Sequence, residues 1–209
     1  MLLDELSEFA RSTLDALRQP LEDGRVAIVR ARHSAVYPAR FMLMAATNPC
    51  PCGYAGERDR CRCGEGDLAR HRRRLSGPLL DRIDLLVNVG RIGADHLAGD
   101  HSTSSAAARE RVREARERQT ARLRGTGVLV NSRMDNRMLR HHLHLDDGAA
   151  RLLTNTRERR VLSERGQHRA LRVARTIADL ARRERVEGEH LAEALSLRPE
   201  GGLSDRRVA

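Results

Sequence analysis

The chain has 209 residues, of which 40% are hydrophobic, and a net charge of +10 from 39 Lys/Arg and 29 Asp/Glu residues. It contains no lysine, so all of the first group is arginine. No stretch approaches the roughly 20 apolar residues that a membrane span needs, and acidic residues interrupt the start, so we expect a cytoplasmic protein without membrane contact. The positive balance suits an anionic partner such as nucleic acid or nucleotide, although a solvated, salt-bridged surface is the alternative.

The first predicted element is a short strand. In MLLDEL, apolar residues end abruptly at Asp4 and Glu5, which is typical of a buried strand that delivers two carboxylates to its carboxyl end. The alternative is a helix N-terminus with acidic residues against its dipole. Residues 7–24 then carry apolar side chains at helical spacing and end at Pro20 and Gly24, which predicts a helix.

A hairpin and a second strand are predicted next. Residues 26–30 alternate as in a strand, and residues 34–37 form its returning arm. The apolar run over residues 41–46 ends just before Asn48, and such a run is typical of a fully buried strand in a parallel sheet. The first part of the chain is therefore predicted to be α/β.

The remaining elements are mostly helical. A loop rich in Cys, Gly and Pro over residues 49–66 precedes a basic helix around residues 68–74. The sequence SGPLLDRIDLLVNV then predicts a short helix and a third strand over residues 85–89. Further on, the patterns predict a linker over residues 90–103, an exposed charged helix over 104–123, and several helices over 134–198. The clearest of these helices has Leu171, Ala174, Ile177 and Ala178 on one stripe.

The chain changes character near residue 103. We therefore predict an α/β domain over residues 1–103, followed by an all-α part over residues 104–198. Residues 199–209 are expected to form a frayed, disordered tail.

Two predicted strand ends carry chemistry. If the strands are neighbours in a parallel sheet, Asp4, Glu5 and Asn48 meet at one edge. Paired carboxylates there can hold Mg²⁺ through water and polarise an attacking water, which the Asn can orient toward a phosphate. Separate capping and turn roles are the alternative, because Asn-Pro commonly begins a turn.

The four cysteines form two Cys-x-Cys pairs in the Gly- and Pro-rich loop: Cys50, Cys52, Cys61 and Cys63. Four thiolates there suit a tetrahedral zinc site that holds the loop, since no position stays open for catalysis. Free or redox-active thiols are the alternative. The residues His141, His142 and His144 do not place three ligands on one helix face, so they predict a surface helix.

Longer motifs follow one another along the whole chain: LLDEL, ALRQPLEDGRV, YPARF, NPCPCG, RLSGPLLDRIDL and RALRVARTIADL. With them the sequence resembles the magnesium-chelatase-like AAA+ ATPases of bacteria, and among these the ComM/YifB type of competence-associated protein, up to about residue 198. The resemblance implies part of a P-loop NTPase core, with an incomplete parallel sheet and a β-hairpin insert, followed by a C-terminal helical lid.

The resemblance also implies roles for single residues. LLDEL looks like a Walker B motif, with Asp4 for Mg²⁺ and Glu5 for water activation. The other implied roles are sensor 1 at Asn48, the arginine finger that acts on a neighbouring subunit's nucleotide at Arg82, and sensor 2 at Arg169, with Arg165 as the fallback. The hairpin is similar to a pre-sensor hairpin that faces a central pore, so Arg30 and Arg32 are candidates for DNA contact without base specificity, or else surface residues.

The family implies ATP, Mg²⁺, a homo-oligomeric hexameric ring, and DNA remodelling such as branch migration during transformation. These ATPases need a Gly-rich loop that ends in Gly-Lys-Ser/Thr, and this sequence has no lysine. We therefore expect a C-terminal fragment, a truncated gene or a mis-called start, with an exposed sheet edge and no ATP hydrolysis alone. The alternatives are a basic, zinc-containing module that binds DNA or full-length subunits, and a chelatase subunit that inserts Mg²⁺ into a porphyrin.

Overall fold

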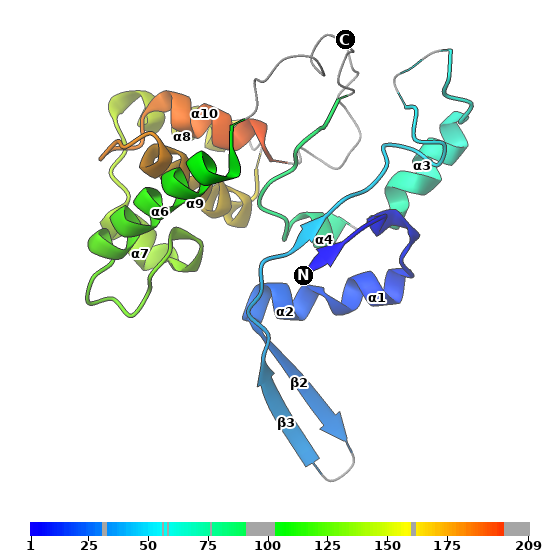
Figure 1. The fold of residues 1–209 in the computed structure, drawn as a ribbon, viewed down its shortest axis with the longest axis horizontal. Coiled ribbons are helices and arrows are strands. Elements are labelled where there is room, and N and C mark those ends of the chain that lie inside the picture. Colours follow the sequence, from blue (N-terminus) through cyan, green and yellow to red (C-terminus); the bar gives the residue numbers. More distant parts are fainter. Residues whose placement is uncertain are drawn as a thin grey trace. The chain divides into compact units, whose positions relative to one another are not determined.

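The structure, a computed structural model, describes residues 1–30, 33–55, 57, 59–75, 77–90, 103–159 and 162–198 (Figure 1). These residues fall into two compact units, which divide between Ile83 and Asp84. Most of the predicted linker and the whole predicted tail lie outside the described residues. The predicted domain boundary at residue 103 therefore stays a prediction, and residues 84–90 group with the helical unit.

A pair of short parallel strands forms the sheet of the first unit. Strand β1 (Leu2–Leu3) pairs with β4 (Met44–Ala45), with Leu2 opposite Met44 and Leu3 opposite Ala45. The pairing continues beyond the strands, because the Leu6 N–H donates to the Ala46 carbonyl at 2.8 Å. The first strand and the run over residues 41–46 are thus parallel neighbours, which is the condition under which the sequence analysis expects their ends to meet at one edge.

The prediction that this run is fully buried is wrong. Only its end forms β4, and the side chains of Met42 and Met44 are 76% and 59% exposed. Ala45, on the opposite face of the strand, packs with Leu3 against the core of the unit. The described sheet therefore has one covered face, so alternate side chains point to solvent. The buried members of this core are Leu6, Leu14, Leu75, Leu79 and Leu80.

The predicted helix over residues 7–24 is divided. It consists of the 3₁₀ turn η1 (Leu6–Glu8), α1 (Arg11–Ala16) and α2 (Arg18–Asp23). Pro20 explains the break, since it has no N–H to donate to the carbonyl of Ala16 and its ring crowds that carbonyl. Gly24, with φ 64°, ends α2 in the left-handed conformation that favours glycine.

The predicted hairpin is present. Strand β2 (Arg25–Arg30) pairs with β3 (His33–Pro38) in antiparallel register, with Arg30 opposite His33 at the outer end. Figure 1 shows the hairpin extending away from α1 and α2 of the same unit. Arg32 lies outside the described residues.

Helices α3 (Glu65–Arg74) and α4 (Gly77–Leu80) complete the first unit and match the predicted basic helix and the short helix after it. The predicted strand over residues 85–89 is wrong, because these residues form no strand. Leu86 instead donates its N–H to the carbonyl of Leu197 at 2.7 Å, and Val87 is 65% exposed. An apolar run becomes a strand only where a partner strand accepts its backbone hydrogen bonds.

The second unit is helical, as predicted. Its elements are α6 (Ser105–Arg122), η2 (Asn131–Arg133), α7 (Asn136–His142), α8 (Asp147–Glu158), α9 (Glu164–Leu180) and α10 (Gly188–Ser196). Side chains at Ser104, Asp135, Asp146 and Ser163 accept backbone N–H groups at the starts of α6 to α9 and so fix where these helices begin.

Helix α9 lies at the centre of the second unit and packs against α6, α7, α10 and η2. The predicted stripe on α9 faces the core: Leu171, Ala174 and Ala178 are buried there, and Ile177 packs against them. No helix among the described residues is both long enough and apolar enough to cross a membrane.

Candidate functional site

The candidate site begins at the carboxyl ends of β1 and β4. Because these strands are adjacent and parallel, Asp4, Glu5 and Asn48 all follow the same edge of the sheet. All three residues are exposed. The strands are adjacent, as a shared site requires, and the joint action of the three side chains stays a prediction.

The backbone of Glu5 adopts an unusual conformation. Its φ of 50° and ψ of 49° lie in the left-handed region, which costs a non-glycine residue roughly 1–2 kcal/mol. The carboxylate of Asp4 accepts the Glu5 N–H at 3.0 Å. The next residue, Leu6, is 3% exposed and bonds to Ala46. Packing of Leu6 therefore holds the bend, and an outlier at a strand end is typical of functional sites.

Asn48 is held from the other side by α3. His71 is 5% exposed, and its Nε2 lies 2.8 Å from the carbonyl oxygen of Asn48. A carbonyl oxygen only accepts, so Nε2 carries the proton and donates it. No sequence pattern indicates this role of His71, because the contact joins residues that are far apart in the chain.

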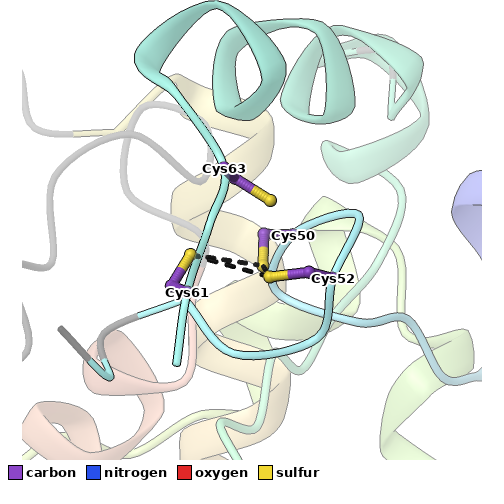
Figure 2. Close-up of side chains that lie close together, drawn as sticks. All are labelled: Cys50, Cys52, Cys61 and Cys63. Atoms are coloured by element: carbon purple, nitrogen blue, oxygen red, sulfur yellow. Dashed lines mark hydrogen bonds between the residues drawn. The ribbon is translucent and has the colours of Figure 1, made fainter. Parts of the chain in front are cut away.

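The four cysteines converge in the loop between Asn48 and α3 (Figure 2). The Sγ atom of Cys50 lies 3.4 Å from that of Cys52 and 4.0 Å from that of Cys61, and Cys52 and Cys61 are 3.7 Å apart. All four sulfurs, including that of Cys63, lie within 4.8 Å of one another. Tetrahedral zinc with Zn–S bonds of about 2.3 Å separates its sulfurs by roughly 3.8 Å, so the donor set fits zinc.

The thiols of this cluster differ in acidity. Backbone N–H groups of Tyr54 and Arg62 lower the pKa of Cys52 to about 6. The backbone of Cys52 lowers the pKa of Cys63, but hydrogen bonding with the Cys52 side chain, burial and Cys50 outweigh this and raise it to about 12. The backbone of Cys63 lowers the pKa of Cys61, but burial and the side chains of Cys52 and Cys50 outweigh this and raise it. The Cys52 thiol therefore loses its proton more readily than those of Cys61 and Cys63.

The candidate arginine finger is paired within its own unit. Arg82 donates to the carbonyl of Pro78 at 2.6 Å and forms an ion pair with Glu22 of α2. Its side chain is 11% exposed. To contact a nucleotide on another subunit, the Arg82 guanidinium would have to release the Glu22 carboxylate and bind a phosphate instead.

The candidate sensor-2 residues lie on α9 of the second unit. Arg169 donates to the Asp84 carboxylate at 2.8 Å and is 12% exposed, whereas Arg165 is exposed in the first turn of α9. A joint site of these arginines with Asp4 and Glu5 stays a prediction. On the hairpin, Arg30 is exposed.

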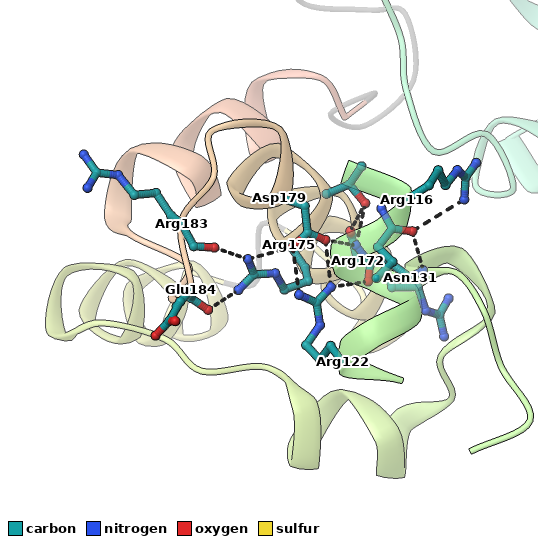
Figure 3. A network of polar contacts seen from close by, with 10 residues as sticks. Arg116, Arg122, Asn131, Arg172, Arg175, Asp179, Arg183 and Glu184 are labelled. Atoms are coloured by element: carbon teal, nitrogen blue, oxygen red, sulfur yellow. Dashed lines mark hydrogen bonds and ion pairs between the residues drawn. The ribbon is translucent and has the colours of Figure 1, made fainter. Parts of the chain in front are cut away.

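A buried polar network, which the sequence analysis missed, stabilises the second unit (Figure 3). The Asp179 carboxylate accepts two bonds from Arg122, at 2.8 and 2.7 Å, and one from Arg175 at 2.9 Å. Asn131 donates to the same carboxylate at 2.8 Å. The spacing of Arg175 and Asp179 at i and i+4 on one helix could have indicated the pair.

Two protein-family models match the chain, one in its first half and one in its second half. The family model described as magnesium chelatase, subunit ChlI, matches residues 1–97, and the model described as magnesium chelatase, subunit ChlI C-terminal, matches residues 102–198. Together these two models account for both units, apart from the segment between them and the last residues.

Three curated relatives have similar levels of identity. The chain is 42% identical over 204 residues to the uncharacterized protein YifB of Salmonella typhimurium, covering 95% of this chain and 38% of YifB. It is 41% identical over 201 residues to the competence protein ComM of Haemophilus influenzae, with the same coverage. It is also 41% identical over 201 residues to an uncharacterized protein of Mycobacterium tuberculosis, covering 96% of this chain and 40% of the relative. The chain thus spans about two fifths of the length of these relatives.

Proposed function

The chain belongs to the magnesium chelatase ChlI family, and we propose that it supplies one part of an ATP-hydrolysing site in a ring-shaped DNA motor. The observation that carries the proposal is the register of β1 and β4, with Leu3 opposite Ala45. This register brings the polar residues that follow each strand to one sheet edge, where α/β proteins bind ligands.

The residues at this edge fit the proposed roles. Asp4 and Glu5 offer exposed carboxylate oxygens, the ligand type that Mg²⁺ prefers, and exposure leaves room for the waters that this ion keeps. Bound Mg²⁺ would neutralise charge on the phosphates. In the proposal, Asp4 binds the ion through water, Glu5 polarises the attacking water, and Asn48 orients that water toward the terminal phosphate.

The remaining parts of the proposed site come from elsewhere. A P-loop needs a lysine that reaches the β- and γ-phosphates, and none of the 209 residues is lysine. The proposal therefore requires a P-loop outside this sequence and predicts no ATP hydrolysis by the 209 residues alone. Arg82 would act on the nucleotide of a neighbouring subunit in a hexameric ring, and Arg169, or failing that Arg165, would approach it from the lid.

Zinc is proposed as the occupant of the four-cysteine cluster. The distances between Sγ atoms match the sulfur spacing of a tetrahedral site. With four protein ligands the ion would have no open position, so its role is to hold the loop after Asn48 and not to catalyse.

The hairpin is the proposed DNA contact. Its outer end pairs Arg30 with His33, and both side chains are exposed. Together with the net charge of +10, this favours contact with a phosphate backbone without base readout. The same feature supports the second candidate function, a basic DNA-binding module without catalysis.

One comparison tests the proposal. The residues of Haemophilus influenzae ComM that precede the matched region, where the resemblance places the P-loop, are joined to Met1 to give a completed chain. We expect Mg²⁺-dependent ATP hydrolysis, stimulated by DNA, from the completed chain and none from the 209 residues. If both chains bind DNA but neither hydrolyses ATP, the binding module replaces the ATPase proposal.

A further inference from the structure

We propose that the four-cysteine cluster sets the position of Asn48, and that His71 is the positioning residue through which it acts. The inference rests on the proposed roles of the cysteines as a zinc site and of Asn48 as the residue that orients the attacking water. It goes further by linking these two sites, which are otherwise separate features of the first unit.

The first link is the chain itself. Asn48 is joined to Cys50 through Pro49 alone, and the proline ring restricts the backbone between them. Cys50 is 0% exposed, and its carbonyl accepts the N–H of Gly53 at 3.0 Å in a turn. Fixing the Sγ atom of Cys50 in a metal site therefore restrains the backbone of Asn48.

The second link runs through α3. Cys63 directly precedes Gly64, which caps this helix: the Gly64 N–H donates to the Asp67 carboxylate at 3.2 Å, and the Asp67 N–H donates back to the Gly64 carbonyl at 3.0 Å. His71 lies further along the same helix and donates to the carbonyl of Asn48 at 2.8 Å. A metal ion that joins Cys50 to Cys63 would close a ring through α3, His71 and Asn48.

Helix α3 also holds the other strand end. Arg74, on its last turn, donates to the carbonyl of Ser7 at 3.1 Å and to the Glu8 carboxylate at 3.0 Å. Ser7 is 3% exposed and lies just beyond Glu5. Helix α3, which begins just after Cys63, thus contacts the backbone at Asn48 and also at Ser7, close to Glu5. We therefore expect that ordering of the cysteine loop and the geometry of the proposed site change together.

Such coupling is reciprocal. If zinc strengthens the bond between His71 and Asn48, then removing that bond must weaken zinc binding by the same factor. One hydrogen bond of this kind corresponds to roughly a three- to tenfold change in affinity. The inference therefore predicts an effect on zinc binding of a residue that is not a ligand.

The test measures zinc affinity of the full 209-residue chain by competition with a chromophoric chelator. We expect His71→Ala to weaken zinc binding about three- to tenfold, and His71→Gln, whose amide can replace the Nε2–H donor, to restore most of it. The matched control is His144→Ala at an exposed position, which should bind zinc like the unchanged chain. In ¹⁵N-edited NMR, the His71 Nε2–H signal should persist with zinc and broaden after chelation.

Each contrary result has a distinct meaning. If the unchanged chain binds zinc and His71→Ala binds it equally well, the coupling is overturned while the zinc site stands. If both His71 variants lose the same affinity, His71 acts by packing and the hydrogen-bond coupling is overturned. If the unchanged chain binds no zinc, the proposed zinc site fails and this inference fails with it. Should His71→Ala not fold, the NMR signal decides, and an unchanged signal after chelation overturns the coupling.

Discussion

Arg175 and Asp179, one turn apart on α9, form an ion pair in which neither side chain reaches solvent, with exposures of 0% and 1%. The guanidinium of Arg175 also donates to the carbonyls of Arg183 and Glu184, beyond the end of the helix. Burial lowers the pKa of Arg175, and Asp179 opposes this shift. The pair therefore joins α9 to the segment that leads into α10.

Removing the Asp179 carboxylate should lower the free energy of unfolding of the second unit. Asp179→Asn leaves the buried guanidinium of Arg175 and the partly exposed guanidinium of Arg122 without their anion, which costs about 3–5 kcal/mol. Urea unfolding followed by circular dichroism measures the change. The control is Asp147→Asn at an exposed position of α8, which should shift the midpoint little. Equal midpoints for the two variants would show that the network does not stabilise the unit.

Glycine at position 5 should increase stability. Glu5 has a φ of 50° and an exposed side chain, so Glu5→Gly relieves backbone strain without loss of packing and should add about 0.5–1 kcal/mol. Thermal unfolding compares it with Glu8→Gly in the same turn, where φ is not positive and glycine should destabilise. A lower melting temperature for Glu5→Gly would contradict the strain at this position.

The second unit should lose stability on mild acidification through His168. Burial lowers the pKa of His168. The positive charges of Arg172, Arg157 and Arg140 lower it further, whereas the negative charge of Glu164 opposes the shift. The unfolded histidine gains its proton near pH 6.5 and the folded one only at lower pH, so stability is complete above the unfolded pKa and falls below it.

His168→Gln should therefore flatten the fall in stability between pH 7 and pH 5. Urea midpoints at the two pH values measure this difference, which is independent of any constant loss caused by the substitution. His33→Gln, at an exposed position of the first unit, is the control and should keep the slope of the unchanged chain. If the urea midpoint changes equally with pH in the unchanged chain and in both variants, His168 does not contribute to the loss of stability in acid.

Zinc binding should weaken as the pH falls. The pKa values of Cys61 and Cys63 are raised, the latter to about 12, so both thiols must lose protons when they bind metal. We expect tighter binding at pH 8 than at pH 6, and a lower melting temperature after chelation. Cys50→Ser should abolish the effect of chelation. A melting temperature that depends on oxidant but not on zinc would favour the redox-active alternative.

Local patterns predicted the elements, and tertiary contacts decided their detail. Alternation predicted the hairpin, and helical spacing predicted the core stripe that includes Leu171 and Ala174, because each signal lies within one element. Apolar runs indicated the strands β1 and β4, but their adjacency is seen only in the structure. The exposure of Met42 and the absence of a strand at residues 85–89 could not be predicted, because both depend on which other strands are present to cover or pair with these residues.

The residue types of the candidate site could be predicted from the sequence, but the geometry of the site could not. Asp4, Glu5 and Asn48 follow apolar runs, which the sequence displays directly. The left-handed backbone of Glu5 and the bond from His71 to Asn48 depend on packing between distant segments, for which a single sequence has no marker. The ion pair of Arg82 with Glu22 was missed for the same reason.

The most direct test of the central claim is ATP turnover by the completed chain with Glu5→Gln. If Glu5 polarises the attacking water, the variant should bind ATP with unchanged affinity and lose at least about 100-fold in kcat. Glu193→Gln, at an exposed position of α10, should keep both values. Turnover by Glu5→Gln at the rate of the unchanged completed chain would contradict the proposed site.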